Sequence, residues 1–132
     1  MTMDRLLTGL AWLIAVAIIF IGARFLLDPD TAAKAFGLPV IAEGNARGFL
    51  FAKGVRDIVS GLVVIVLSLA GQKTALGLFL LVAAIIPLGD MAIVLRQGGS
   101  PATAFGIHGV TALMLLAVGA GLTWRSWSFV HA

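Results

Sequence analysis

The most informative residues of this sequence are charged and polar side chains that interrupt a long apolar segment. Lys53, Arg56, Asp57 and Ser60 all lie within segment 48–70. Their spacing of three, four and seven residues from Lys53 places them on one face of a helix. An ionisable group among apolar residues is costly unless it pairs or faces a polar interior, so we expect this face to point into the protein. These four residues are candidates for binding the polar end of a ligand.

Three more polar residues lie near the ends of other apolar segments. Arg24 lies near the end of the first segment. At a helical rise of about 1.5 Å per residue, Asp90 lies about 8 Å before the end of the third segment and His108 about 9 Å after the start of the fourth. These ends fall on the same side of the protein, so the polar residues are predicted to form one layer beneath the longest loop. Asp90 and His108 are candidate catalytic residues, because an imidazole beside a carboxylate can exchange a proton near neutral pH.

The charges of this predicted layer do not balance. Three cations (Arg24, Lys53, Arg56) and two carboxylates (Asp57, Asp90) give about +1 with the histidine neutral. One cation is therefore available for the acidic or carbonyl head of an amphipathic molecule, which Arg56 and Lys53 would hold while Asp57 orients Arg56. The same residues also fit a different interpretation, in which the charges pair only with one another and fix the packing of the helices.

Helices that cross a membrane are the elements expected to position these residues. The chain has 132 residues, of which 61% are hydrophobic and 11% charged, whereas a soluble domain is about 45–50% apolar and about 25% charged. A transmembrane helix needs about 20 mostly apolar residues. The predicted fold is an all-α integral membrane four-helix bundle, in a single domain over 1–132, with both termini on one side. Its four spans are 6–27, 48–70, 75–95 and 102–123.

Proline and glycine predict two local features of this bundle. In the longest loop, Asp28 and Pro29 have the pattern of a helix N-cap followed by proline in the first turn. A short interfacial helix is therefore expected over 31–36, closed by Gly37. In the third span, Pro87 is expected to kink the helix and to free the carbonyl four residues earlier.

The composition also argues against several classes of function. The chain has no cysteine and two histidines, so we expect no metal site and no thiol chemistry. Its basic residues are scattered rather than gathered in a stripe, so we expect no nucleic-acid partner, and no cofactor motif is present. We expect a multi-pass protein of the cell membrane in contact with membrane lipid. Its orientation stays open, because basic residues are divided almost evenly between the two sides.

Four short motifs stand out in the sequence: Phe36-Gly37-Leu38-Pro39, Lys53-Gly54-Val55-Arg56-Asp57, Pro87-Leu88-Gly89-Asp90 and His108-Gly109. Together they resemble the motifs of an uncharacterised family of small four-span membrane proteins from bacteria and fungi. The resemblance covers nearly the whole chain and is most specific at the Gly-x-Arg-Asp element of the second span. The chain is also loosely similar to the DoxX-like proteins, which implies a partner in a membrane redox or quinol-linked complex.

The sequence therefore leads to two functional hypotheses. In the first, the protein binds an amphipathic or anionic small molecule in its polar layer. Proton-coupled transport by a homodimer is one variant of this hypothesis, and intramembrane isomerase or lyase chemistry is another. In the second, the protein is a non-catalytic accessory or scaffold subunit of a membrane complex, whose buried ion pairs only fix helix packing. A cavity that touches the charged side chains would favour the first hypothesis.

Overall fold

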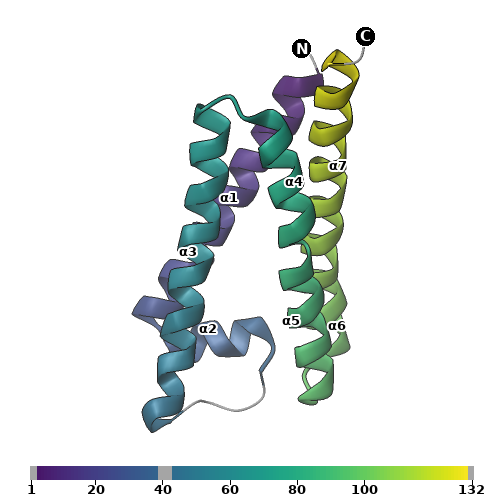
Figure 1. Ribbon diagram of the computed structural model, residues 1–132. Helices are drawn as coiled ribbons and strands as arrows, with labels where there is room; N and C mark the ends of the chain where they lie inside the picture. The colour runs from purple at the N-terminus through teal and green to yellow at the C-terminus, as the bar shows by residue number, and fades with distance from the viewer. Residues whose placement is uncertain (1–2, 39–42, 131–132) are drawn as a thin grey trace.

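The computed structural model describes residues 3–38 and 43–130, and over these residues the fold is all-helical, as predicted (Figure 1). The short helix expected in the longest loop is present, and it begins at Pro29. Each predicted span corresponds to one long helix or to consecutive helical segments. The elements are α1 (Met3–Leu27), α2 (Pro29–Phe36), η1 (Gly44–Ala46), α3 (Arg47–Leu69), α4 (Lys73–Ala83), α5 (Ile85–Arg96), α6 (Pro101–Thr103), the π-helical segment η2 (Ala104–Gly109) and α7 (Val110–Val130).

The long helices form two closely packed pairs, α1 with α3 and α4 with α7. Glycines allow the backbones of each pair to approach each other. A Cβ atom built on Gly22 of α1 would lie 2.5 Å from the carbonyl oxygen of Gly54 in α3, and one built on Gly119 of α7 would lie 2.9 Å from the carbonyl oxygen of Gly77 in α4. Each pair is thus a tightly packed unit.

The two pairs join through an apolar core in the half of the molecule where α1 begins and α7 ends (Figure 1). Asp4 adds a polar link at this end, because it pairs with Arg125 of α7 and, at 3.3 Å, with Lys73 of α4. The start of α1 and the end of α7 lie at the same end of the molecule, as predicted. The core residues are Ala11, Ala15, Val64, Leu76, Leu80, Ala84, Leu115, Val118 and Leu122.

At the opposite end the two pairs separate, and α2 lies across the space between them (Figure 1). The predicted cap is present: the Asp28 side chain accepts a hydrogen bond from the backbone N–H of Thr31 at 3.2 Å. Gly37 ends α2 with a φ of +102°, a left-handed conformation that glycine adopts without steric cost. The buried face of α2 packs against Phe25 of α1 and Leu50 of α3.

Two irregular segments occur in the helices that flank this space. The predicted kink is present as a break between α4 and α5 at Ala84, because Pro87 has no N–H to continue the helical ladder. The π-helical segment η2 was not predicted. The carbonyl of Ile107 in this segment accepts a hydrogen bond from the Thr111 hydroxyl at 2.7 Å, and η2 places His108 in a buried position.

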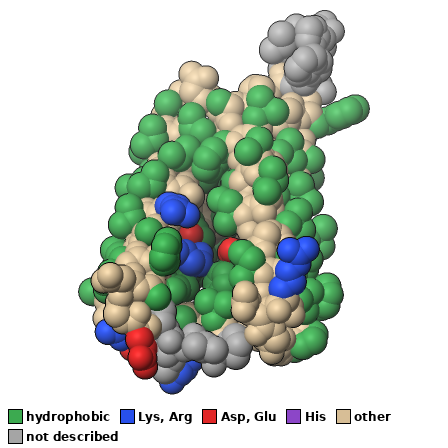
Figure 2. Space-filling model, turned by 60° about the horizontal axis from the view of Figure 1, so that its bottom comes forward, with side chains coloured by type: hydrophobic (Ala, Val, Ile, Leu, Met, Phe, Trp, Pro, Cys, Tyr) green, Lys and Arg blue, Asp and Glu red, His purple; other side chains and the backbone are tan. Residues whose placement is uncertain are grey.

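In the part of the chain that the structure describes, three helical segments are long and apolar enough to cross a membrane: Met3–Leu27, Lys73–Arg96 and Pro101–Ser126. Apolar side chains cover much of the outer surface (Figure 2). Both observations indicate a membrane protein. Helix α3 is 23 residues long but is not among the three, and Lys53, Arg56 and Asp57 interrupt its apolar run. The residues that distinguish α3 are therefore those singled out by the sequence.

Candidate functional site

A cavity of about 500 Å³ lies between the two helix pairs and is bordered at one end by α2. Figure 2 shows the surface hollowed between the two halves of the molecule, with acidic and basic side chains inside the hollow. Most of the lining is apolar, with Leu13, Val64, Phe79 and Leu115 among the residues toward the core. The polar lining residues belong to α1, α3, α5, η2 and α7: Arg24, Lys53, Asp57, Ser60, Asp90, His108 and Thr111.

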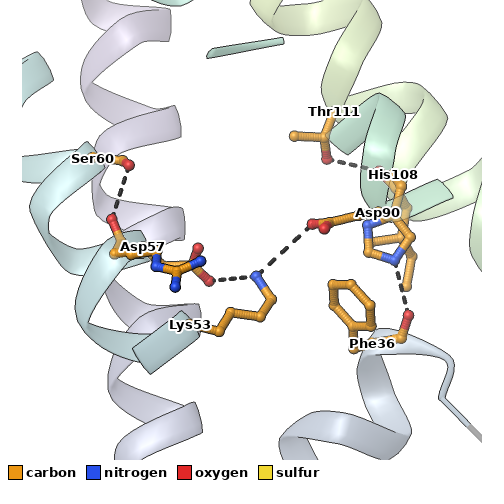
Figure 3. A network of polar contacts seen from close by, with 9 residues as sticks. Phe36, Lys53, Asp57, Ser60, Asp90, His108 and Thr111 are labelled. Atoms are coloured by element: carbon orange, nitrogen blue, oxygen red, sulfur yellow. Dashed lines mark hydrogen bonds and ion pairs between the residues drawn. The ribbon is translucent and has the colours of Figure 1, made fainter. Parts of the chain in front are cut away.

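The ammonium group of Lys53 lies at the centre of the polar end of this cavity (Figure 3). It donates a hydrogen bond to Asp57 Oδ2 at 2.8 Å, one turn along the same helix. It also forms an ion pair with Asp90 Oδ2 at 3.8 Å, across the space between α3 and α5. Lys53 is therefore the residue that links the two helix pairs electrostatically at this level.

Two aromatic rings complete the surroundings of this ammonium group. The Lys53 Nζ atom lies 5.0 Å from the ring centroid of Phe25 and 5.0 Å from that of Phe36. These distances are within the range of cation–π attraction. The two rings meet edge to face, with their centroids 6.1 Å apart. The ammonium group is thus held by two carboxylates and two rings, which we call the Lys53 cage.

His108 connects the π-helical segment to α2 (Figure 3). Its Nε2 atom lies 2.8 Å from the backbone carbonyl oxygen of Phe36, and its ring centroid lies 4.5 Å from that of Phe36. A carbonyl oxygen only accepts hydrogen bonds, so Nε2 carries the hydrogen, and in the neutral ring Nδ1 is left as an acceptor. The ring also interacts electrostatically with Asp90. Asp90 and His108 thus both line the cavity, and direct proton exchange between them stays a prediction.

Arg56 is the predicted site residue that the structure places elsewhere. Its side chain is exposed, and it is not among the residues that line the cavity. Asp57 hydrogen-bonds Lys53 and does not orient Arg56 toward a ligand. The physical reason is the turn of about 100° per helical residue, which leaves Arg56 about 60° to one side of Lys53 and Asp57 about 40° to the other. Of Lys53 and Arg56, the two cations expected to hold the head of a ligand, Lys53 is the one that lines the cavity.

This placement changes the charge of the site. The charged lining residues are two cations, Arg24 and Lys53, and two carboxylates, Asp57 and Asp90. With His108 neutral they sum to zero, and the excess positive charge expected from the sequence is absent from the cavity. Ser60 also lines the cavity, and its hydroxyl donates to the carbonyl of Arg56 within its own helix at 2.9 Å.

The aromatic half of the Lys53 cage was not predicted. Phe36 belongs to a short motif and to the helix expected over 31–36, neither of which predicts contact with Lys53. Phe25 gives no signal, because a phenylalanine at the end of an apolar helix is ordinary. The ring of Phe25 is almost fully buried. The two rings reach the Lys53 ammonium group together only because α2 folds back against α1. The spacing of residues within one segment cannot predict such a contact.

Comparison with known proteins identifies the family of this chain. Residues 15–122 match the family described as "Domain of unknown function (DUF4267)", and this region contains every charged residue that lines the cavity. No curated protein and no solved structure matches the chain. The resemblance to an uncharacterised family is thus confirmed, whereas the likeness to DoxX-like proteins stays a prediction. The chain belongs to the DUF4267 family, whose defining domain has no known function.

Proposed function

We propose that this protein is a four-span protein of the cell membrane that binds an amphipathic small molecule in the cavity between its two helix pairs. The observation that carries the proposal is the shape of the lining: an apolar space of about 500 Å³ that ends at the Lys53 cage. Cavities of about 300–1,000 Å³ with apolar walls and a few polar groups are typical of small-molecule sites.

The fourth span of this proposal is α3. Its 23 residues exceed the roughly 20 that a span needs, and it packs along the apolar helix α1. Two of its charged residues, Lys53 and Asp57, pair with each other inside the protein, which lowers the cost of placing them at membrane depth. The other spans are α1, α4 with α5, and α6 with η2 and α7.

A ligand in this cavity would lie with its polar head at the Lys53 cage and its apolar part toward Val64, Phe79 and Leu115. The hollow seen in Figure 2 opens between the two helix pairs, and this opening is where an amphipathic molecule would enter. Asp90 and His108 would exchange protons with the head of the ligand if binding is coupled to transport or to chemistry.

The second candidate function is that of an accessory or scaffold subunit. The observation that favours it is the hydrogen-bonded pair of Lys53 and Asp57, since a network that satisfies itself needs no ligand. A purely structural network, however, leaves no reason for a cavity beside the charges. The two functions therefore differ in whether the cavity is filled by a small molecule.

Native mass spectrometry of the purified protein tests the proposal. We expect the wild-type protein to retain a small amphipathic molecule. Ala83 lines the cavity, so Ala83→Phe should fill space and reduce the retained mass. Ala92 is exposed on α5, so Ala92→Phe is the matched control and should leave retention unchanged. If neither the wild type nor the control carries a molecule, the scaffold function is the correct one.

A further inference from the structure

Two carboxylates share one ammonium group at the polar end of the cavity, and they share it unequally. Asp57 receives the hydrogen bond from Lys53 at 2.8 Å, whereas the ion pair with Asp90 spans 3.8 Å and is too long for a hydrogen bond. Within residues 3–38 and 43–130, no side chain or backbone group donates a hydrogen bond to Asp90. The carboxylate of Asp90 thus lines the cavity with its oxygens still able to accept.

The other charged groups near Asp90 do not compensate for it. Arg24 lines the cavity but interacts electrostatically with Asp28, beyond the end of α1. Arg56 is exposed and lies outside the lining. His108 uses its Nε2 hydrogen on the carbonyl of α2. None of these groups supplies a hydrogen bond to Asp90, so its charge is balanced only in part, by a lysine that it shares.

Within the Lys53 cage itself, one cation faces two carboxylates. The lining as a whole is neutral only because it includes Arg24, and Arg24 also interacts with Asp28. A second carboxylate charge in an apolar cavity is costly unless a cation or a proton accompanies it. The surroundings also favour a cation, since the Lys53 ammonium group already lies 5.0 Å from the centroids of two aromatic rings. Alkylated ammonium groups are recognised by the same combination of rings and negative charge.

We propose that the cavity binds an amphipathic organic cation, an ammonium group on an apolar chain, whose head forms an ion pair with Asp90. This inference rests on the proposed function and names the class of its ligand. Lys53 stays on Asp57, and the ligand completes the charge balance. A proton and the ligand compete for the same carboxylate: when the ligand binds to protonated Asp90, the O–H bond breaks, the carboxylate pairs with the ammonium, and the proton passes to the solvent.

The test compares two probes with the same chain and opposite heads, decyltrimethylammonium and decanoate, by titration calorimetry on the full chain in maltoside micelles. We expect the ammonium to bind and the decanoate not to bind. Asp90→Asn should weaken ammonium binding at least about tenfold, a factor equivalent to about 1.4 kcal/mol. Glu43→Gln is the control, because it removes an exposed carboxylate that lies outside the cavity. Wild-type binding should also weaken as the pH is lowered.

The outcomes separate this inference from the proposed function. Binding of decanoate without the ammonium would overturn the cationic head and leave the ligand-binding cavity standing. Ammonium binding that is equal in wild type and Asp90→Asn would also overturn the inference. If Asp90→Asn does not fold, two measurements on the wild-type protein test the inference: which of the two probes it binds, and how that binding changes with pH. Absence of binding by either probe, together with no retained molecule in native mass spectrometry, would refute both.

Discussion

Replacing Lys53 by methionine removes the ammonium group from its cage and keeps most of the volume of the side chain. The Asp57 carboxylate, with a side chain only 7% exposed, then loses its hydrogen-bond donor. Removing one partner of a buried ion pair costs about 3–5 kcal/mol, and an exposed pair contributes about 0–1 kcal/mol. Because the Lys53 side chain is 23% exposed, we expect Lys53→Met to lower the free energy of unfolding by about 2–3 kcal/mol.

A double-mutant cycle isolates the ion pair from other effects of the substitution. In the variant that combines Lys53→Met with Asp57→Asn, the carboxylate charge is gone as well, so part of the stability should return. The two changes should couple by about 1–2 kcal/mol. The exposed Lys34 provides a control, and Lys34→Met should change stability by no more than about 0.5 kcal/mol.

Unfolding in mixed micelles with increasing dodecyl sulfate, followed by far-ultraviolet circular dichroism, measures these differences. Equal stability of Lys53→Met and Lys34→Met would refute the reasoning, because the cage would then hold nothing together. The double variant also bears on function. If it regains stability but no longer retains a small molecule, the charges serve the ligand; if it regains both, they serve only packing.

Two further predictions concern other parts of the fold. Gly22→Ala should destabilise the protein by about 1–3 kcal/mol, because the new Cβ would lie 2.5 Å from the carbonyl oxygen of Gly54. Gly48→Ala in α3 should instead stabilise the protein by up to about 1 kcal/mol, because no atom lies within 4 Å of its new Cβ. Equal stabilities of the two variants in chemical unfolding would contradict the close approach of α1 and α3. At the start of α2, hydrogen bonds from Thr31 hold the pKa of Asp28 below its usual range. The carboxylate cap therefore stabilises α2 at every pH above about 3.9, and this contribution is lost as the pH falls through the lowered value. A carboxyl carbon titration by nuclear magnetic resonance with a midpoint at or above about 3.9 would show that the cap is absent.

Much of the fold could be predicted because its signals are local. Long apolar runs locate the four helical regions, and Asp28, Pro29 and Gly37 mark the ends of α2 by their own conformational preferences. Pro87 predicts a break one turn before itself for the same reason. In each case the residues that carry the signal lie within a few positions of the structure that they determine, so no tertiary contact needs to be known.

The parts that could not be predicted depend on contacts between distant segments. The hydrogen bond between His108 and the carbonyl of Phe36 joins residues 72 positions apart, and the Lys53 cage needs rings from α1 and α2 together. The spacing of Arg56 fits one face of α3 as well as that of Lys53 does. The position of the neighbouring helices decides which edge of that face is buried, and in this structure Arg56 lies on the exposed edge.

The location of the packing forces bears on the role of the charges. Helices α1 and α3 are held together by the glycine contact at Gly22 and Gly54, and the two pairs join in an apolar core at the end of the molecule away from α2. Neither set of contacts includes a residue of the Lys53 cage, whose charges lie where the pairs separate. A network needed only for packing would be expected where the helices meet. Because this one lines the space between them, its role is better explained by a molecule that enters that space.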